Sequence, residues 1–347
     1  MALPLLRLVV LGVLVLASRP TQAQKLFSSN EKRVSTARVV IVQDPAATQS
    51  LQPVPEIIQG LVDRAIISLT AKSTASAAWM SLVSTQDTIG IKVFSTPGPN
   101  SGTRLPVVVA VVQDLLAAGI PPGHIIVWDR RAIDLRLAGF FDLQKRFGIR
   151  VQGSMDEGYD NKVFYETALL GNLSWTDMEF GKKGLDIGRK SYVSKLVTKE
   201  MTKIINITPL MHHNLAGASG NLYNLAFGSV DNIVRFETDA ETLARSLPEI
   251  YALPILGDRV VLNIVDALIC QYEGEQKGLL HYSSVLNQLR FSRDPVALDV
   301  LSIFEINRQR LLAGVPVLKT NLELYANASL LEIGVSDMRH IQVDKLP

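Results

Sequence analysis

The sequence predicts an α/β fold built on a mostly parallel β-sheet with helices on both faces. Two observations carry this prediction. Short apolar runs at 37–43, 88–94 and 124–128 are rich in β-branched residues, as expected for strands buried on both faces. A helical pattern at 105–118 joins two of these runs through short connections, and a helix between successive strands implies that the strands are parallel.

Local patterns predict the first helices. Residues 56–70 place apolar side chains three and four positions apart, which is typical of one face of a helix. The helix at 105–118 has Pro106 in its first turn, where the missing amide hydrogen is tolerated. Gly119 follows its last residue, as glycine commonly does at a helix end.

The second half of the chain continues the same alternation. Buried strands are predicted at 203–208 and 259–265, with a helix over 238–251 between them. A last long helix is predicted from Pro295 to about residue 312, and Asp294 is expected to cap its start.

The first 23 residues have the pattern of a secretory signal peptide. An apolar run at 8–17 follows a basic start, and small residues lead up to Ala23, where cleavage is expected. That run is too short for the roughly 20 residues of a spanning helix, so no stable membrane insertion is expected after cleavage. Residues 24–347 then form the α/β domain, as one large domain or as two lobes. Residues 153–190 are polar and spaced by glycines, and we expect them to form an insertion or a cap.

Cysteine content and charge limit the compartment and the partners. Cys270 is the only cysteine, so an intrachain disulfide is excluded, and an exported chain without disulfides is expected in a bacterial periplasm or outside the cell. The chain has 35 basic and 33 acidic residues, and losing Arg7 and Arg19 with the leader makes the two equal. This balance gives no electrostatic basis for binding nucleic acid or an anionic membrane. The oligomeric state stays open.

Five segments of the chain, taken in order, carry a family resemblance. They lie at 78–93, 103–108 (TRLPVV), 115–130, 209–228 and 263–299. Together they resemble the bacterial family known as domain of unknown function 362. Because the name of that family states no activity, the resemblance implies membership and leaves the reaction open.

The resemblance also bears on cofactors. Some relatives carry iron–sulfur clusters on cysteine motifs or on fused ferredoxin modules, but this chain has only Cys270, so no cluster is implied here. The family often has Lys-Asn where this chain has Tyr223 and Asn224, which puts in doubt any activity that depends on that lysine. A redox relative that has lost its cluster is one alternative for this chain.

Polar residues at the ends of predicted strands indicate a site. In an open parallel sheet, ligands bind beyond the carboxyl ends of the strands. Lys92 lies near the end of its strand, while Asp129 follows the strand at 124–128 and Asp266 follows the strand at 259–265. We therefore expect these three side chains to lie at one edge of the sheet.

The loop before the helix at 105–118 adds an expected anion site. Free amide groups at a helix start favour an anion, and Thr103 and Arg104 lie there. We expect a small carboxylate or phosphate to contact Lys92, Thr103 and Arg104, and the resemblance adds Asn224. The alternative is that Arg104 pairs with an acidic residue at the surface and that the Lys92 ammonium only reaches solvent.

His212 and His213 are the candidate proton-transfer residues. They follow the strand at 203–208 and precede a glycine-rich turn, so we expect them in a loop. Histidine titrates near neutral pH and commonly binds metals. The pair is compatible with acid–base chemistry, or, with Asp129, Asp266 or Glu273, with a divalent metal site of mixed nitrogen and oxygen ligands. Whether a metal binds, and which metal, stays open.

The leading interpretation is an exported enzyme that acts on a small anionic substrate, with His212, His213, Asp129 and Asp266 as catalytic residues. The alternative is an exported binding protein that carries a small ligand or a metal to a partner without turnover. An enzyme predicts a histidine and a carboxylate within hydrogen-bond reach in a water-poor pocket. A carrier predicts a hinge and many donors without such a pair.

Overall fold

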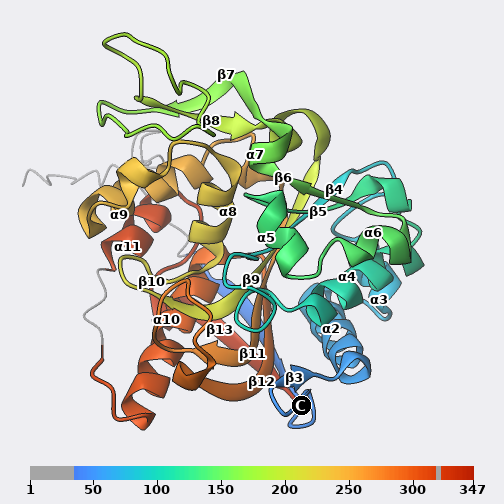
Figure 1. Cartoon of the computed structure of the whole chain (residues 1–347). Helices are drawn as coiled ribbons and strands as arrows, with labels where there is room; N and C mark the ends of the chain where they lie inside the picture. Colours follow the sequence, from blue (N-terminus) through green and yellow to red (C-terminus); the bar gives the residue numbers. More distant parts are fainter. Residues whose placement is uncertain (1–34, 318–321) are drawn as a thin grey trace, which may run out of the picture. The chain divides into compact units, whose positions relative to one another are not determined.

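Nine strands in the described residues form the main sheet of this computed structural model (Figure 1). Residues 35–317 and 322–347 are described, so the predicted signal peptide at 1–23 lies outside them. The strands are β1 (Ala37–Gln43), β4 (Ile89–Lys92), β5 (Ile125–Asp129), β6 (Arg150–Gly153), β9 (Lys203–His213), β10 (Gly217–Ala218), β11 (Val260–Gln271), β12 (Ser283–Ser292) and β13 (Ile341–Leu346). Their order is β13-β1-β12-β11-β9-β4-β5-β6, and β10 pairs with β9.

The sheet is mostly parallel, which confirms the predicted fold class. β11, β9, β4, β5 and β6 pair in parallel in that order, and β13 is parallel to β1. β12 is antiparallel to both of its neighbours. β12 reverses direction because the short connection 272–282 leads to it from β11, whereas a parallel neighbour requires a longer crossover.

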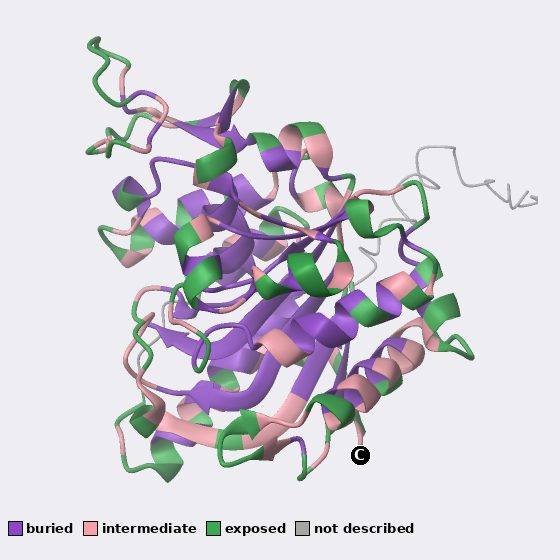
Figure 2. Cartoon of the chain, turned by 45° about the vertical axis from the view of Figure 1, so that its right-hand side comes forward, coloured by how far each residue is buried: buried purple, intermediate pink, exposed green. Residues whose placement is uncertain are grey.

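Helices cover both faces of the sheet, as predicted. One face carries α2 (Pro55–Thr70), α3 (Ala75–Met80) and α4 (Leu105–Ala117), and the other carries α8 (Asn221–Ser229), α9 (Ala240–Tyr251), α10 (Pro295–Leu312) and α11 (Glu323–Leu330). Successive side chains of β1 point to opposite faces of the sheet. Val40 and Val42 belong to the core on the face of α2, and Val39 and Ile41 belong to the core on the face of α8. The central strands are therefore buried along most of their length (Figure 2).

Two predicted strands are longer than expected. β9 continues through Pro209 to His213, and β11 continues past Asp266 to Gln271. Pro209 cannot donate to a ladder, but the pairing with β11 shifts register directly after it, between Asp266 and Cys270. This irregularity accommodates the proline and lets both strands continue. His212 and His213 therefore lie on a strand that pairs with β10, and not in a loop.

The segment expected to be an insertion or a cap contains little regular structure. After β6 comes the short helix α7 (Ser154–Glu157), and then β7 (Tyr159–Glu166) pairs antiparallel with β8 (Lys190–Ser194). Two further short helices, α5 (Ala132–Leu137) and α6 (Asp142–Phe147), precede β6. Ser35–Pro347 form one compact unit. Within the described ranges, no helix has the length and apolar character needed to cross a membrane.

Helix α8 is held by a carboxylate from another helix. All nine of its residues are buried. Asp299 on α10 is 1% exposed and accepts hydrogen bonds from the backbone amides of Asn221 at 2.6 Å and Leu222 at 3.0 Å. A Cβ on Gly220 would lie 2.3 Å from Asp299 Oδ1, so this approach requires glycine there. The predicted cap at Asp294 is confirmed, since its carboxylate accepts from the amide of Ala297 at 2.8 Å.

We predict that Asp299→Ala lowers the free energy of unfolding by about 3 kcal/mol, because it leaves buried amides at the start of α8 without acceptors. Urea unfolding followed by circular dichroism measures this loss. Arg245→Ala, which removes an exposed partner of Glu241, is the control and should change stability very little. Equal effects of the two substitutions would contradict this account of α8.

Candidate functional site

Three neighbouring strands place polar side chains at one level under α8. Lys92 on β4 lies opposite Asn206 on β9, and Asn206 lies opposite Asn263 on β11. Ile91 and Ile205, which precede Lys92 and Asn206, belong to the core on the α4 side. Because side chains alternate along a strand, the lysine and the two asparagines point to the face that α8 covers.

Lys92 is buried with a complete set of hydrogen bonds. Its side chain is 1% exposed, and Nζ donates to Asp129 Oδ1 at 2.6 Å, Asn224 Oδ1 at 2.6 Å and the carbonyl of Val93 at 2.7 Å. An ammonium has three hydrogens, so each one has an acceptor. Burial lowers the pKa of Lys92, and the Asp129 charge opposes that shift.

The helix above Lys92 leaves room for its side chain. A Cβ on Gly228 of α8 would lie 2.1 Å from Lys92 Cε, so a larger residue would collide with the lysine. On the other side, Lys92 Nζ lies 5.6 Å from the centroid of the Trp128 ring. The lysine is thus enclosed by α8 and by β5.

Asp129 and Asn224 are themselves held by further hydrogen bonds. Asp129 Oδ2 accepts from the amide of Ser95 at 2.7 Å and from its hydroxyl at 2.6 Å, and Oδ1 accepts from the amide of Arg130 at 2.7 Å. The Asn224 amide group donates to Asn206 Oδ1 at 2.8 Å. Every polar partner of the lysine therefore has a fixed orientation.

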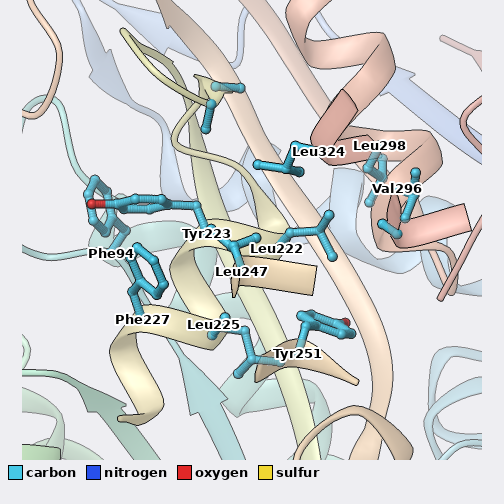
Figure 3. Packing of buried hydrophobic residues seen from close by; sticks show 14 of the residues in the cluster. Phe94, Leu222, Tyr223, Leu225, Phe227, Leu247, Tyr251, Val296, Leu298 and Leu324 are labelled. Carbon is cyan, nitrogen blue, oxygen red and sulfur yellow. The ribbon is translucent and has the colours of Figure 1, made fainter. Parts of the chain in front are cut away.

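A cavity of roughly 810 Å³ opens beside this cluster, and we call it the α8 cavity. Its wall is polar on one side and aromatic on the other. Tyr223 and Phe227 project from α8 toward Phe94, while Leu222 points to the opposite side of the helix, where Leu298 lies (Figure 3). Charged and polar residues on the wall include Lys92, Asp129, Arg130, Arg131, Asn224 and Glu237.

The segment expected to be an insertion or a cap contributes to the wall as well. Met155 and Asp156 of α7 and Trp175 and Thr176 of the following loop line the α8 cavity. Trp175 is 81% exposed, so most of its indole faces solvent and not the protein. Residues 153–190 thus form one side of the opening.

Arg130 differs from the other cations of the wall. Its Nε is buried and has no hydrogen-bond partner among the residues that the structure describes. Arg131 donates to Asp134 Oδ2 at 2.8 Å, and the three donors of Lys92 are engaged. The Arg130 side chain as a whole is half-buried, lies on the wall of the α8 cavity and also interacts with the hydroxyl of Tyr159.

A second polar group on the wall joins Tyr223, Glu237 and Gln276. The Tyr223 hydroxyl donates to Glu237 Oε1 and accepts from Gln276 Nε2 at 2.7 Å. Burial raises the pKa of Glu237 above its ordinary value. Sequence reasoning did not identify Glu237. The unusual tyrosine at 223 was the available signal, but it did not show which carboxylate it meets.

Thr103, Arg104 and Asp266 form a separate structural cluster. Thr103 Oγ1 donates to the carbonyl of Ile207 at 2.8 Å and accepts from the amide of Phe94 at 2.9 Å. The Asp266 carboxylate accepts from the Arg104 amide at 2.9 Å and from its guanidinium at 3.1 Å. The start of α4 does hold an anion, but that anion is Asp266 and not a ligand. None of the three lines the α8 cavity.

The two histidines lie away from this cavity. His212 is six residues beyond Asn206 on β9, roughly 20 Å along the strand. Both of its ring nitrogens are buried without partners in the described part of the chain, and burial lowers its pKa to about 4. His213 Nδ1 accepts from the amides of Leu215 and Ala216, and burial lowers its pKa to about 4 as well. Neither histidine lines the α8 cavity.

His213 contacts the cavity wall through a tyrosine. The rings of His213 and Tyr223 are 4.4 Å apart between centroids. Within the part of the chain that the structure describes, no three His, Cys, Asp or Glu side chains are grouped so that they could hold a metal ion. The structure thus brings together Lys92, Asp129 and Asn224 from the predicted set and leaves the rest outside this cavity.

Comparison with known proteins identifies the family. A search of curated proteins finds no match. A structural-genomics crystal structure of a Thermotoga maritima protein is similar, with 11% identity and a TM-score of 0.41 over 76% of this chain and 60% of that one. This chain therefore spans less than two thirds of that protein. The family model described as Domain of unknown function (DUF362) matches residues 89–303, which is more than half of the sequence. This confirms the resemblance found in the sequence, and the chain belongs to that family.

Proposed function

We propose that this chain is an enzyme that binds and acts on a small anion, a carboxylate or a phosphate, in the α8 cavity. The observation that carries this proposal is Arg130, whose half-buried side chain brings a positive charge to the cavity wall. An anionic oxygen in the cavity would accept a charge-assisted hydrogen bond from the guanidinium, and such a bond is stronger than a neutral one.

The form of the cavity supports a small organic ligand. A volume of roughly 810 Å³ lies in the range of small-molecule sites, which typically combine apolar walls with a few placed polar groups. Phe94, Phe227 and Trp175 offer aromatic surface, and Arg130 and Arg131 offer positive charge. A flat carboxylate such as benzoate matches both features.

Turnover is supported by the titratable pair on the same wall. Glu237 and Tyr223 are joined by a hydrogen bond, burial raises the pKa of Glu237, and a carboxyl and a hydroxyl in contact are groups that can pass a proton to or from a ligand. This pair takes the role for which the sequence indicated His212 and His213. The histidines stay candidates only for a reaction that takes place outside the α8 cavity.

A binding protein without turnover is the second candidate. It is favoured by Lys92, because all three of its donors are used inside the protein and none is left for a reacting group. In that case Arg130 would hold the anion, and the rest of the wall would only exclude water.

We predict that Arg130→Met weakens binding of benzoate or phosphate at least about tenfold, because a charged hydrogen bond contributes about 1.5–3 kcal/mol. Isothermal titration calorimetry and thermal shift measure the change. Arg136→Met removes an exposed arginine that stacks on Phe141 and does not line the cavity, so it should bind like the native protein. If both variants bind alike, the anion does not bind at Arg130.

Prolonged incubation separates an enzyme from a carrier. We predict that at least one compound in a panel of small carboxylic acids and phosphate monoesters is converted by the protein, as followed by ¹H and ³¹P NMR. Glu237→Gln should bind the same compound without converting it. If ligands bind tightly but their NMR spectra do not change with time, the protein is a binding protein without turnover and not an enzyme.

A further inference from the structure

The Tyr223 hydroxyl has a defined hydrogen-bond direction. Gln276 Nε2 can only donate, so the tyrosine oxygen accepts from it at 2.7 Å. The single proton of the hydroxyl then goes to Glu237 Oε1. In this arrangement Glu237 is the acceptor, and no proton of Tyr223 is left for a ligand in the cavity.

Packing fixes the ring but leaves the hydroxyl free to turn. The Tyr223 ring lies 4.4 Å from His213, 5.2 Å from Phe227 and 6.5 Å from Phe94 between centroids. Rotation about the bond between the ring and the oxygen moves only the hydrogen. Tyr223, Glu237 and Gln276 all line the α8 cavity, so the hydrogen has a ligand position to turn toward.

Two charged side chains, one from each of two segments, act on the protonation of Glu237. Arg130, after β5, favours the ionised carboxylate, and Glu275, in the loop after β11, disfavours it. Tyr223 from α8 donates its hydrogen bond to the ionised form, and burial acts against that form. An anion bound beside Arg130 would reduce the stabilising effect of that arginine on Glu237. Anion binding and protonation of Glu237 are therefore expected to favour each other.

We propose that Glu237 takes up one proton from solvent when an anion binds, and that Tyr223 then turns its hydroxyl hydrogen to the anion. The protonated carboxyl donates to the tyrosine oxygen in place of accepting from it. The only covalent bond that forms is the O–H bond on Glu237, and no covalent bond of the protein breaks. This inference rests on the proposed anion site, since it names how that site selects its ligand.

Calorimetry with benzoate tests this proton uptake. Titrations in Tris and in bis-Tris, whose ionisation enthalpies differ, report the number of protons taken up with the ligand. We expect up to one proton for the native protein, and an affinity that rises as the pH falls from about 8 to about 6, by at most about tenfold per pH unit. The affinity rises at lower pH because the carboxylate is ionised in the free protein and protonated in the complex, so protons favour the complex.

Two glutamate-to-glutamine variants show which residue takes up the proton. Glu237→Gln places a donor toward Tyr223, so it should take up no proton and bind benzoate at about pH 8 as tightly as the native protein binds at about pH 6. Glu275→Gln makes the same chemical change beside the pair but off the cavity wall, and it should keep the uptake. Thermal unfolding of both variants shows that each is folded.

The outcomes separate the two proposals. Benzoate binding without proton uptake, or a Glu237→Gln variant that retains the pH dependence, overturns the proton-coupled hydroxyl and leaves the anion site in place. A native protein that binds neither benzoate nor inorganic phosphate overturns both proposals together. Tyr223→Phe should bind benzoate more weakly at every pH, because the hydrogen bond to the anion is missing, while any proton uptake that remains should keep its matching pH dependence.

Discussion

An ammonium group without solvent contact needs an acceptor for each of its hydrogens, and this requirement organises the α8 cavity. Lys92 meets it with a carboxylate from β5, an amide from α8 and its neighbouring carbonyl. Removing water from a charge is costly, and a buried pair is tolerated only when its geometry and its remaining hydrogen bonds are complete. Asp129, Asn224 and the glycine at 228 therefore hold fixed places relative to the lysine.

The position of α8 follows from the same constraint. The helix is buried on all sides, yet it carries asparagines, so its polar groups must meet partners at the sheet. Asn224 bonds to Asn206, and Asn206 in turn donates to the carbonyl of Asn221 at 2.9 Å. Asp299 fixes the start of the helix from the other side. Tyr223 reaches the cavity because these contacts determine which way α8 faces.

The sequence alone was sufficient to predict many of the strands and helices. Continuous apolar runs identified β1, β4 and β5, and the proline and glycine signals at Pro106 and Gly119 located α4. Lys92 and Asp129 were found because each ends its strand at the same edge of the sheet. These features follow from local sequence patterns and from the position of binding residues at the carboxyl ends of parallel strands. They could therefore be predicted without knowing which distant residues are in contact.

Other features depended on contacts between distant residues. The strand was predicted at 203–208, but the irregular pairing on β11 carries β9 onward through Pro209, and the histidines move away with it. The start of α4 attracts an anion, yet the sequence does not show that Asp266, 162 positions away, supplies it. Glu237 follows a short 3₁₀ turn and has no local motif, so its contact with Tyr223 emerged only in three dimensions.

The dependence of the site on the buried ion pair can be measured with a double-mutant cycle. Lys92→Met and Asp129→Asn, alone and together, are compared by urea unfolding. Each single change leaves a buried group without its partner and should lower the free energy of unfolding by about 3–5 kcal/mol. The double variant should lose less than the sum by at least about 2 kcal/mol, since contacting residues couple. Additive losses, or a Lys92→Met protein as stable as the native one, would contradict the account.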